Sequence, residues 1–213
     1  KFCDENAEWL EDFALFMAIK ESQGGISWDN WPIEFRSRQP EALSSFAKSN
    51  PDAIEKHKVR QFFFFDQWAK VLEYAHSKNI QIIGDIPIFI AYDSADAWSH
   101  PEQFYLDESG KPTVVAGVPP DYFSPTGQHW GNPLYRWDAH KKENYSWWIK
   151  RFKAVLKMVD IVRLDHFRGF AGYWEIPAGN PTAEFGRWVK GPGKPFFKAL
   201  IDEFKDLPII AED

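Results

Sequence analysis

The sequence predicts an α/β fold that contains part of a (β/α)8 TIM barrel. Three short apolar runs, rich in Ile and Val, each end in a carboxylate: residues 80–85, 160–165 and 207–212. Runs of this kind are typical of parallel strands buried on both faces, and helical patterns separate them at residues 145–159 and 195–204. Because a barrel collects the carboxyl ends of its strands at one face, we expect the three terminal carboxylates to line one cavity.

Residues 1–79 are expected to form a helical segment that leads into the barrel. Apolar side chains recur at helical spacing over residues 7–22, which predicts an amphipathic helix. Glycines and prolines in a polar setting favour loops with short helical turns over residues 23–49. An Asn-Pro pair suited to a helix start predicts a second helix over residues 51–78. We expect this helix to bury an apolar stripe (Val59, Phe62, Phe65, Trp68, Leu72 and Ala75) and to expose a cationic cluster to solvent (Lys56, His57, Lys58 and Arg60).

Residues 80–213 are expected to form the central part of the barrel domain, with a long insertion over residues 91–144. An ordinary barrel unit takes roughly 30 residues, so a connection of this length has another role. The insertion contains several prolines with aromatic residues between them. The prolines restrict its backbone, and the aromatic rings can pack against other groups. It also holds His100, His129 and His140, but their spacing matches no zinc signature, and we predict no metal site.

Composition and charge restrict the classes of partner. The chain has 25 basic and 31 acidic residues and a net charge of −6, which disfavours nucleic acid and suits a neutral substrate better. Its one cysteine cannot build a disulfide framework. Neither a charged-then-apolar leader nor an apolar stretch of about 18 residues appears. We therefore expect no membrane span and a cytoplasmic setting, with a plastid as the alternative for a plant protein.

Aromatic residues are abundant, at 17% of the chain with 11 Trp. Sugar-binding sites commonly use aromatic faces, because the C–H groups of a pyranose pack against a flat ring. The alternative is that these rings belong to the core, where large aromatics dominate the buried area. The composition therefore indicates either a carbohydrate site or an aromatic-rich core.

The strand-end carboxylates Asp85, Asp165 and Glu212 are the candidate catalytic groups. An acid after a strand can instead cap the next helix, although Glu is a poor N-cap residue. Arg163 lies two residues before Asp165, so the two share a face of the strand and the guanidinium can hold the carboxylate ionised. Cleavage of a glycosidic bond needs one carboxylate as nucleophile and one carboxyl group as proton donor. Asp165 fits the nucleophile, and Glu212, which has no cationic partner in its own strand, fits the donor.

Five ordered motifs carry a resemblance to a known family. They are Gly84–Phe89, Gly117–Ser124, Trp130–Tyr135, Val162–Gly169 and Ile210–Asp213. With these motifs the chain resembles glycoside hydrolase family 77, the amylomaltases, also called 4-α-glucanotransferases or disproportionating enzymes. The resemblance is dense over residues 80–213 and loose over residues 1–79.

The resemblance implies a glycosyltransferase of starch and glycogen metabolism. Such an enzyme moves 1,4-α-glucan segments between malto-oligosaccharides, or onto glucose, by a retaining double displacement through a covalent glycosyl-enzyme intermediate. Glucans derived from starch or glycogen would be its substrates, and no cofactor is implied. The chain would hold about the third to fifth strands of the barrel, with the family's third catalytic Asp beyond Asp213. We therefore expect the 213 residues alone to be inactive, and their open half-barrel to aggregate or pair.

Position by position, the resemblance implies Asp165 as the nucleophile and Glu212 as the general acid/base. It also implies that Asp85, Arg163 and His166 contact or polarise the sugar at the cleavage point. Two alternatives stay open here: His166 could only hydrogen-bond within the barrel mouth, and Asp85 could only hold Arg163 in place.

The region of Asp121, Tyr122 and Phe123 corresponds to a lid over the substrate groove in the resembled family. A lid excludes water from the intermediate and favours attack by another sugar hydroxyl. Trp130 is expected to offer a stacking face nearby, unless its role is structural. Two further hypotheses stand beside the transferase: an α-amylase-like retaining hydrolase, and a non-catalytic glucan-binding protein.

Overall fold

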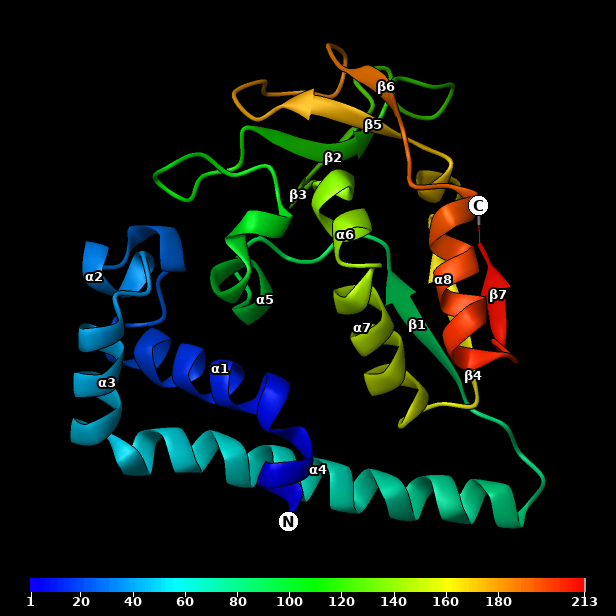
Figure 1. Ribbon diagram of the computed structural model, residues 1–213. Helices are drawn as coiled ribbons and strands as arrows, with labels where there is room; N and C mark the ends of the chain where they lie inside the picture. Colours follow the sequence, from blue (N-terminus) through cyan, green and yellow to red (C-terminus); the bar gives the residue numbers. More distant parts are fainter. Residues whose placement is uncertain (213) are drawn as a thin grey trace.

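The computed structural model describes residues 1–212 and contains two β-sheets flanked by helices (Figure 1). The first sheet is parallel and consists of β1 (Ile83–Pro87), β4 (Ile161–Asp165) and β7 (Ile209–Ala211), in the spatial order β1-β4-β7. Its register places Asp85 beside Arg163. The prediction that the three apolar runs form neighbouring parallel strands is therefore confirmed, while closure of such a sheet into a (β/α)8 barrel stays a prediction.

The parallel strands differ from the expectation in length and burial. β1 begins at Ile83, later than predicted, because the backbone N–H of Ile82 donates to Oδ2 of Asp160 (2.8 Å). Leu164 of the central strand is fully buried, whereas Ile83 and Ile210 of the outer strands are 56% and 43% exposed. The expectation of burial on both faces is wrong for β1 and β7. In β1, Ile86 is 1% exposed whereas Ile83 and Asp85 on the opposite face are exposed, so one face alone packs against the core in the described chain.

The hydrophobic core packs the parallel sheet against α7 (Ser146–Leu156) and α8 (Lys194–Phe204), close to the two predicted helical ranges (Figure 1). Aromatic rings dominate it, and Trp28, Trp98 and Trp148 are each at most 2% exposed. Large rings supply much of the area that stabilises a core. The aromatic-rich core that the composition left open is therefore present, and it accounts for many of the Trp residues.

The amino-terminal part is helical, and α1 (Phe2–Ser22) crosses the long helix α4 (Pro51–Ser77) (Figure 1). Both predicted helices are confirmed, although α1 begins earlier than predicted. Between them lie the 3-10 helix η1 (Trp28–Asn30), α2 (Ile33–Arg36) and α3 (Pro40–Ser49). The loop prediction is wrong for α3, a helix of 10 residues whose first-turn proline is a start signal. No helix of the described part has the length and hydropathy of a membrane-spanning segment.

The two faces of α4 also differ from the prediction. His57 of the predicted solvated cluster is 3% exposed, because α1 packs against this side of the helix. Lys58 forms an ion pair with Glu11 of α1 (2.5 Å). Phe62 and Val59 of the predicted buried stripe are 44% and 38% exposed. The cationic side of α4 therefore faces α1 and pairs with acidic side chains there. The periodicity of α4 alone does not indicate this contact between the two helices.

The insertion over residues 91–144 is largely structured. It contains α5 (Ala95–Ser99), the 3-10 helix η2 (Pro101–Gln103), β2 (Val114–Val118), β3 (Gln128–Pro133) and α6 (Trp137–Lys142). After β4 the chain passes through the 3-10 helix η3 (Phe167–Phe170) into β5 (Gly172–Pro177) and β6 (Arg187–Lys190). These strands form an antiparallel sheet of order β3-β2-β5-β6 on the side where the parallel strands end (Figure 1). This second sheet is not predicted from the sequence.

The burial of His140 in α6 predicts a pH dependence of stability. The side chain is 1% exposed among aromatic rings, and desolvation lowers its pKa to about 4. Between this pKa and the ordinary value of 6.5, the unfolded chain binds the proton and the folded chain does not. Stability present above pH 6.5 is therefore lost as the pH falls toward 4, by on the order of 3 kcal/mol.

We expect His140→Gln to reduce this dependence, measured by urea unfolding between pH 4 and 7. The matched control is His129→Gln, because His129 lies exposed on β3. The control variant should keep the wild-type slope of unfolding free energy against pH. Equal slopes for wild type and His140→Gln would contradict the prediction.

Candidate active site

Four charged side chains that the sequence predicts as neighbours meet at the carboxyl ends of the parallel strands. Nη1 of Arg163 lies 2.8 Å from Oδ1 of Asp85 and 3.2 Å from Oδ1 of Asp165. Nη2 of Arg163 lies 3.3 Å from Oε1 of Glu212. The β1–β4 register places Asp85 beside Arg163, and a two-residue spacing puts Arg163 and Asp165 on one face of β4. Strand order thus brings together residues that are far apart in the chain.

Arg163 organises this cluster. The hydrogen bond that it donates to Asp85, with the charges of Asp85, Glu212 and Asp165, raises the pKa of its guanidinium above the ordinary value. The four side chains are 35% to 56% exposed, so the ion pairs contribute little to stability and mainly fix orientation. The contact between Arg163 and Glu212 was not predicted from the sequence. The strand that leads to Glu212 contains no cation, and the partner Arg163 comes from the adjacent strand β4.

Glu212 is held against the end of β4 by its backbone and its side chain. Its N–H donates to the carbonyl of Leu164 (3.0 Å), and its carbonyl accepts from the N–H of Phe167 (2.7 Å). The backbone N–H of His166 donates to Oε2 of Glu212 (3.2 Å). His166 has a φ of 52°, in the left-handed region, where a non-glycine residue is uncommon. This turn directly after Asp165 aims the His166 N–H at the second carboxylate.

A cavity of about 160 Å³ opens beside Asp165. Its lining residues come from the end of β1, from β3 and from the end of β4: Pro87, Ile88, Phe89, Trp130, Asn132, Asp165 and His166. The rings of Trp130 and His166 meet edge to face, with centroids 5.1 Å apart. The structure thus brings the predicted residues Trp130, His166 and Asp165 to one hollow. Phe89 and Asn132 lie within two of the five motifs, and no role is predicted for either from the sequence.

The predicted lid residues lie on the loop between β2 and β3. Tyr122 and Phe123 are 96% and 91% exposed, and their rings contact each other at a centroid distance of 5.6 Å. The carboxylate of Asp121 accepts hydrogen bonds from the N–H groups of Phe123 and Ser124, both at 2.8 Å, and so shapes the turn. None of these residues lines the cavity beside Asp165. Their function as a lid stays a prediction.

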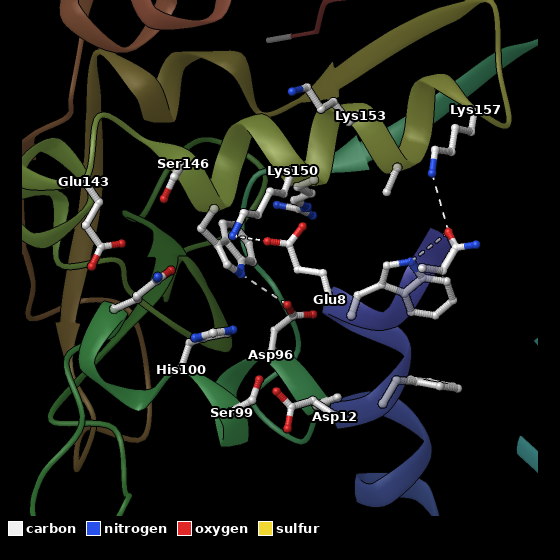
Figure 2. A pocket seen from close by; sticks show the side chains of 18 of the residues that line it. Glu8, Asp12, Asp96, Ser99, His100, Glu143, Ser146, Lys150, Lys153 and Lys157 are labelled. Atoms are coloured by element: carbon white, nitrogen blue, oxygen red, sulfur yellow. Dashed lines mark hydrogen bonds and ion pairs between the residues drawn. The ribbon is translucent and has the colours of Figure 1, made fainter. Parts of the chain in front are cut away.

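A larger cavity of about 630 Å³ lies between α1, α5 and α7, away from the predicted site residues (Figure 2). Figure 2 shows polar side chains that pair with each other across it. Lys150 forms an ion pair with Glu8, and Nε1 of Trp147 donates to Oδ1 of Asp96 (3.2 Å). We therefore place the candidate site at the smaller cavity, which adjoins the carboxylates at the strand ends.

Comparison with known proteins shows to which family the chain belongs. The family model of glycoside hydrolase family 77, described as 4-alpha-glucanotransferase, matches residues 1–213. The chain belongs to this family. A 4-alpha-glucanotransferase from Thermus thermophilus is 52% identical over 212 residues, which is 100% of this chain and 42% of that protein. The chloroplastic/amyloplastic 4-alpha-glucanotransferase of Solanum tuberosum is 47% identical over 97% of this chain and 36% of its own length.

Solved structures of the family share the fold. The amylomaltase from Streptococcus agalactiae in complex with acarbose superposes with a TM-score of 0.96 at 45% identity, over 100% of this chain and 43% of that one. The amylomaltase from Corynebacterium glutamicum matches with a TM-score of 0.69 at 20% identity, over 96% of this chain and 26% of that one, which shows the fold alone. The resemblance to family 77 is thus confirmed. The chain spans less than half the length of these family members, so an activity is proposed only for the complete polypeptide that contains residues 1–213.

Proposed function

We propose that the complete polypeptide is a 4-α-glucanotransferase that moves 1,4-α-glucan segments between malto-oligosaccharides or onto glucose. The observation that carries the proposal is the contact of Asp165 and Glu212 with the same guanidinium, next to a cavity with an aromatic wall. Retaining enzymes keep their two carboxyl groups about 5–5.5 Å apart. Contacts to one guanidinium are compatible with such a short separation. Membership of family 77 supports the same reaction.

The proposed mechanism has two displacement steps at the anomeric carbon. In the first, Asp165 Oδ attacks this carbon, the bond to the glycosidic oxygen breaks, and Glu212 gives its proton to that oxygen. In the second, Glu212 takes a proton from the hydroxyl of an acceptor sugar, whose oxygen displaces Asp165 with overall retention. Because a guanidinium stabilises an ionised carboxylate, Arg163 would have to weaken its contact with Glu212 whenever Glu212 carries the proton.

The other site residues receive supporting roles in this proposal. Arg163 orients Asp165 and Asp85 through the ion pairs described above. Trp130 and His166 form the wall on which the reacting sugar would rest, with His166 also able to hydrogen-bond it. Tyr122 and Phe123 would cover the bound glucan, which excludes water and favours an acceptor sugar over hydrolysis. We further propose that the three parallel strands belong to a (β/α)8 barrel whose mouth is this site.

Incubation of the complete polypeptide with maltotriose tests the proposal. We expect malto-oligosaccharides longer than maltotriose, together with glucose, resolved by anion-exchange chromatography. Formation of glucose and maltose without longer chains would support the hydrolase instead. Unchanged maltotriose that nevertheless binds would support a glucan-binding protein without catalysis.

A further inference from the structure

The segment that follows β1 forms one wall of the candidate site and is held by side chains. Pro87, Ile88 and Phe89 line the cavity beside Asp165, and Ile88 and Phe89 are at most 5% exposed. A buried carbonyl without a hydrogen bond destabilises the folded state. The buried carbonyl of Ile88 therefore needs donors, and side chains of later elements supply them to it and also to the carbonyl of Pro87, which is an exposed residue.

Arg151 of α7 supplies the largest share of these hydrogen bonds. Its Nη2 donates to the carbonyl of Pro87 (2.7 Å) and its Nη1 to the carbonyl of Ile88 (3.3 Å). The hydroxyl of Tyr135 donates to the same Ile88 carbonyl (2.8 Å) and accepts a hydrogen bond from Arg151 Nη1 (3.3 Å). One planar guanidinium therefore reaches two consecutive carbonyl groups and the tyrosine that shares one of them.

The surroundings of Arg151 fit this use of the guanidinium. Its central carbon lies 4.8 Å from the ring centroid of Trp148 and 5.6 Å from that of Trp147, so aromatic rings hold it in place. Within residues 1–212 no carboxylate lies within ion-pair distance of it. The neighbouring cations of α7 behave differently, because Lys150 and Lys153 pair with Glu8 and with Glu203. The guanidinium N–H groups of Arg151 thus donate to the backbone of Pro87 and Ile88, which line the cavity beside Asp165.

We propose that Arg151 is a positioning residue for the reaction. It holds the wall of Pro87, Ile88 and Phe89 against the reacting sugar, and through that wall it fixes Asp85, which lies two residues before Pro87. A displacement of about 1 Å in a reacting group can lower a rate by about 100-fold. A lysine at this position keeps the charge but has one nitrogen, which cannot serve both carbonyls in the same plane. The inference rests on the proposed function.

The test is Arg151→Lys in the complete polypeptide with maltotriose as donor and acceptor. We expect kcat/KM for transfer to fall by about 10- to 100-fold, with most of the loss in kcat. Arg151→Ala should lose more, and guanidinium chloride at millimolar concentration should restore part of its rate. Tyr135→Phe should lose less than Arg151→Lys, because Arg151 still donates to Ile88, and its effect should shrink in the Arg151→Lys background.

The matched control is Lys150→Met, which removes a neighbouring cation that faces Glu8 across the larger cavity (Figure 2). This variant should keep wild-type kcat and KM. Wild-type kinetics for Arg151→Lys, beside an active wild type, would overturn the positioning role and leave the proposed function standing. A wild type that forms no longer chains would overturn the proposed function. Calorimetry of maltotriose binding then decides separately: weaker binding by Arg151→Lys supports the positioning role, and equal binding overturns it.

Discussion

Replacement of Asp165 by Asn is expected to lower kcat for transfer from maltotriose by on the order of 10⁴-fold in the complete polypeptide. The amide cannot form the glycosyl ester that separates the two displacement steps. It keeps the size of the carboxylate, and Arg163 keeps its contacts with Asp85 and Glu212, so the fold should be little changed. Initial rates of longer-chain formation, with thermal unfolding as a check on the fold, measure the effect.

Asp160→Asn is the matched control for this variant. Asp160 lies just before β4, where its side chain accepts from the N–H of Ile82 and contacts His76 (2.9 Å). The same chemical change there should lower stability and leave kcat for transfer near the wild-type value. An Asp165→Asn enzyme with a rate within tenfold of wild type would exclude Asp165 as the nucleophile. A glucan-binding protein without catalysis would show no turnover to lose and unchanged maltotriose affinity in this variant.

The meeting of the acidic residues was predictable because it follows from chain topology. Parallel strands place their carboxyl ends at one edge, so Asp85 and Asp165 become neighbours wherever the strands pair directly, as β1 and β4 do. The contact between Arg163 and Glu212 was not predictable in the same way. It depends on which strands are adjacent and on how far a long side chain reaches between them, and neither follows from the pattern within one strand.

The antiparallel sheet was missed for a related reason. β2 pairs with β5, about 60 residues further along the chain, after β4 has intervened. Period-two patterns in these short strands are weak, and a proline-rich stretch is typical of a loop. In the structure Gly127 closes the loop between β2 and β3, with a φ of +68° and the Val118 carbonyl close to it. The pairing of β2 with β5 is thus non-local, whereas β3, which carries Trp130, pairs with the nearby strand β2.

The contact partners of buried side chains could also not be predicted from the sequence pattern within a single helix. His57 seemed solvated from its charged neighbours, yet α1 covers it. The helical pattern over residues 145–159 likewise gives no indication that Arg151 donates to the carbonyls of Pro87 and Ile88, more than 60 residues earlier. Charge patterns indicate which faces are polar. They do not indicate which polar face lies against a backbone segment that needs donors.

Glu212→Gln is expected to slow transfer from a donor whose leaving group needs a proton and to spare a donor whose leaving group does not. This difference distinguishes the proton donor from the nucleophile. With maltotriose, kcat should fall by about 10²–10⁴-fold, because the departing sugar oxygen no longer receives a proton. With maltotriosyl fluoride the first step should stay near the wild-type rate, since fluoride departs without protonation. The covalent adduct on Asp165 should then accumulate, because no general base activates the acceptor hydroxyl, and intact mass spectrometry would detect it.

Glu203→Gln provides the control for this last experiment, because Glu203 lies on α8 and its side chain pairs with Lys153. This variant should transfer from maltotriose and from the fluoride at wild-type rates. Equal losses of Glu212→Gln with both donors would contradict the role of Glu212 as general acid. The contrast between donors has a physical basis that no general loosening of the site reproduces: a displaced wall or a misplaced Asp165 slows attack on either donor, whereas a missing proton slows only the donor whose leaving group needs it.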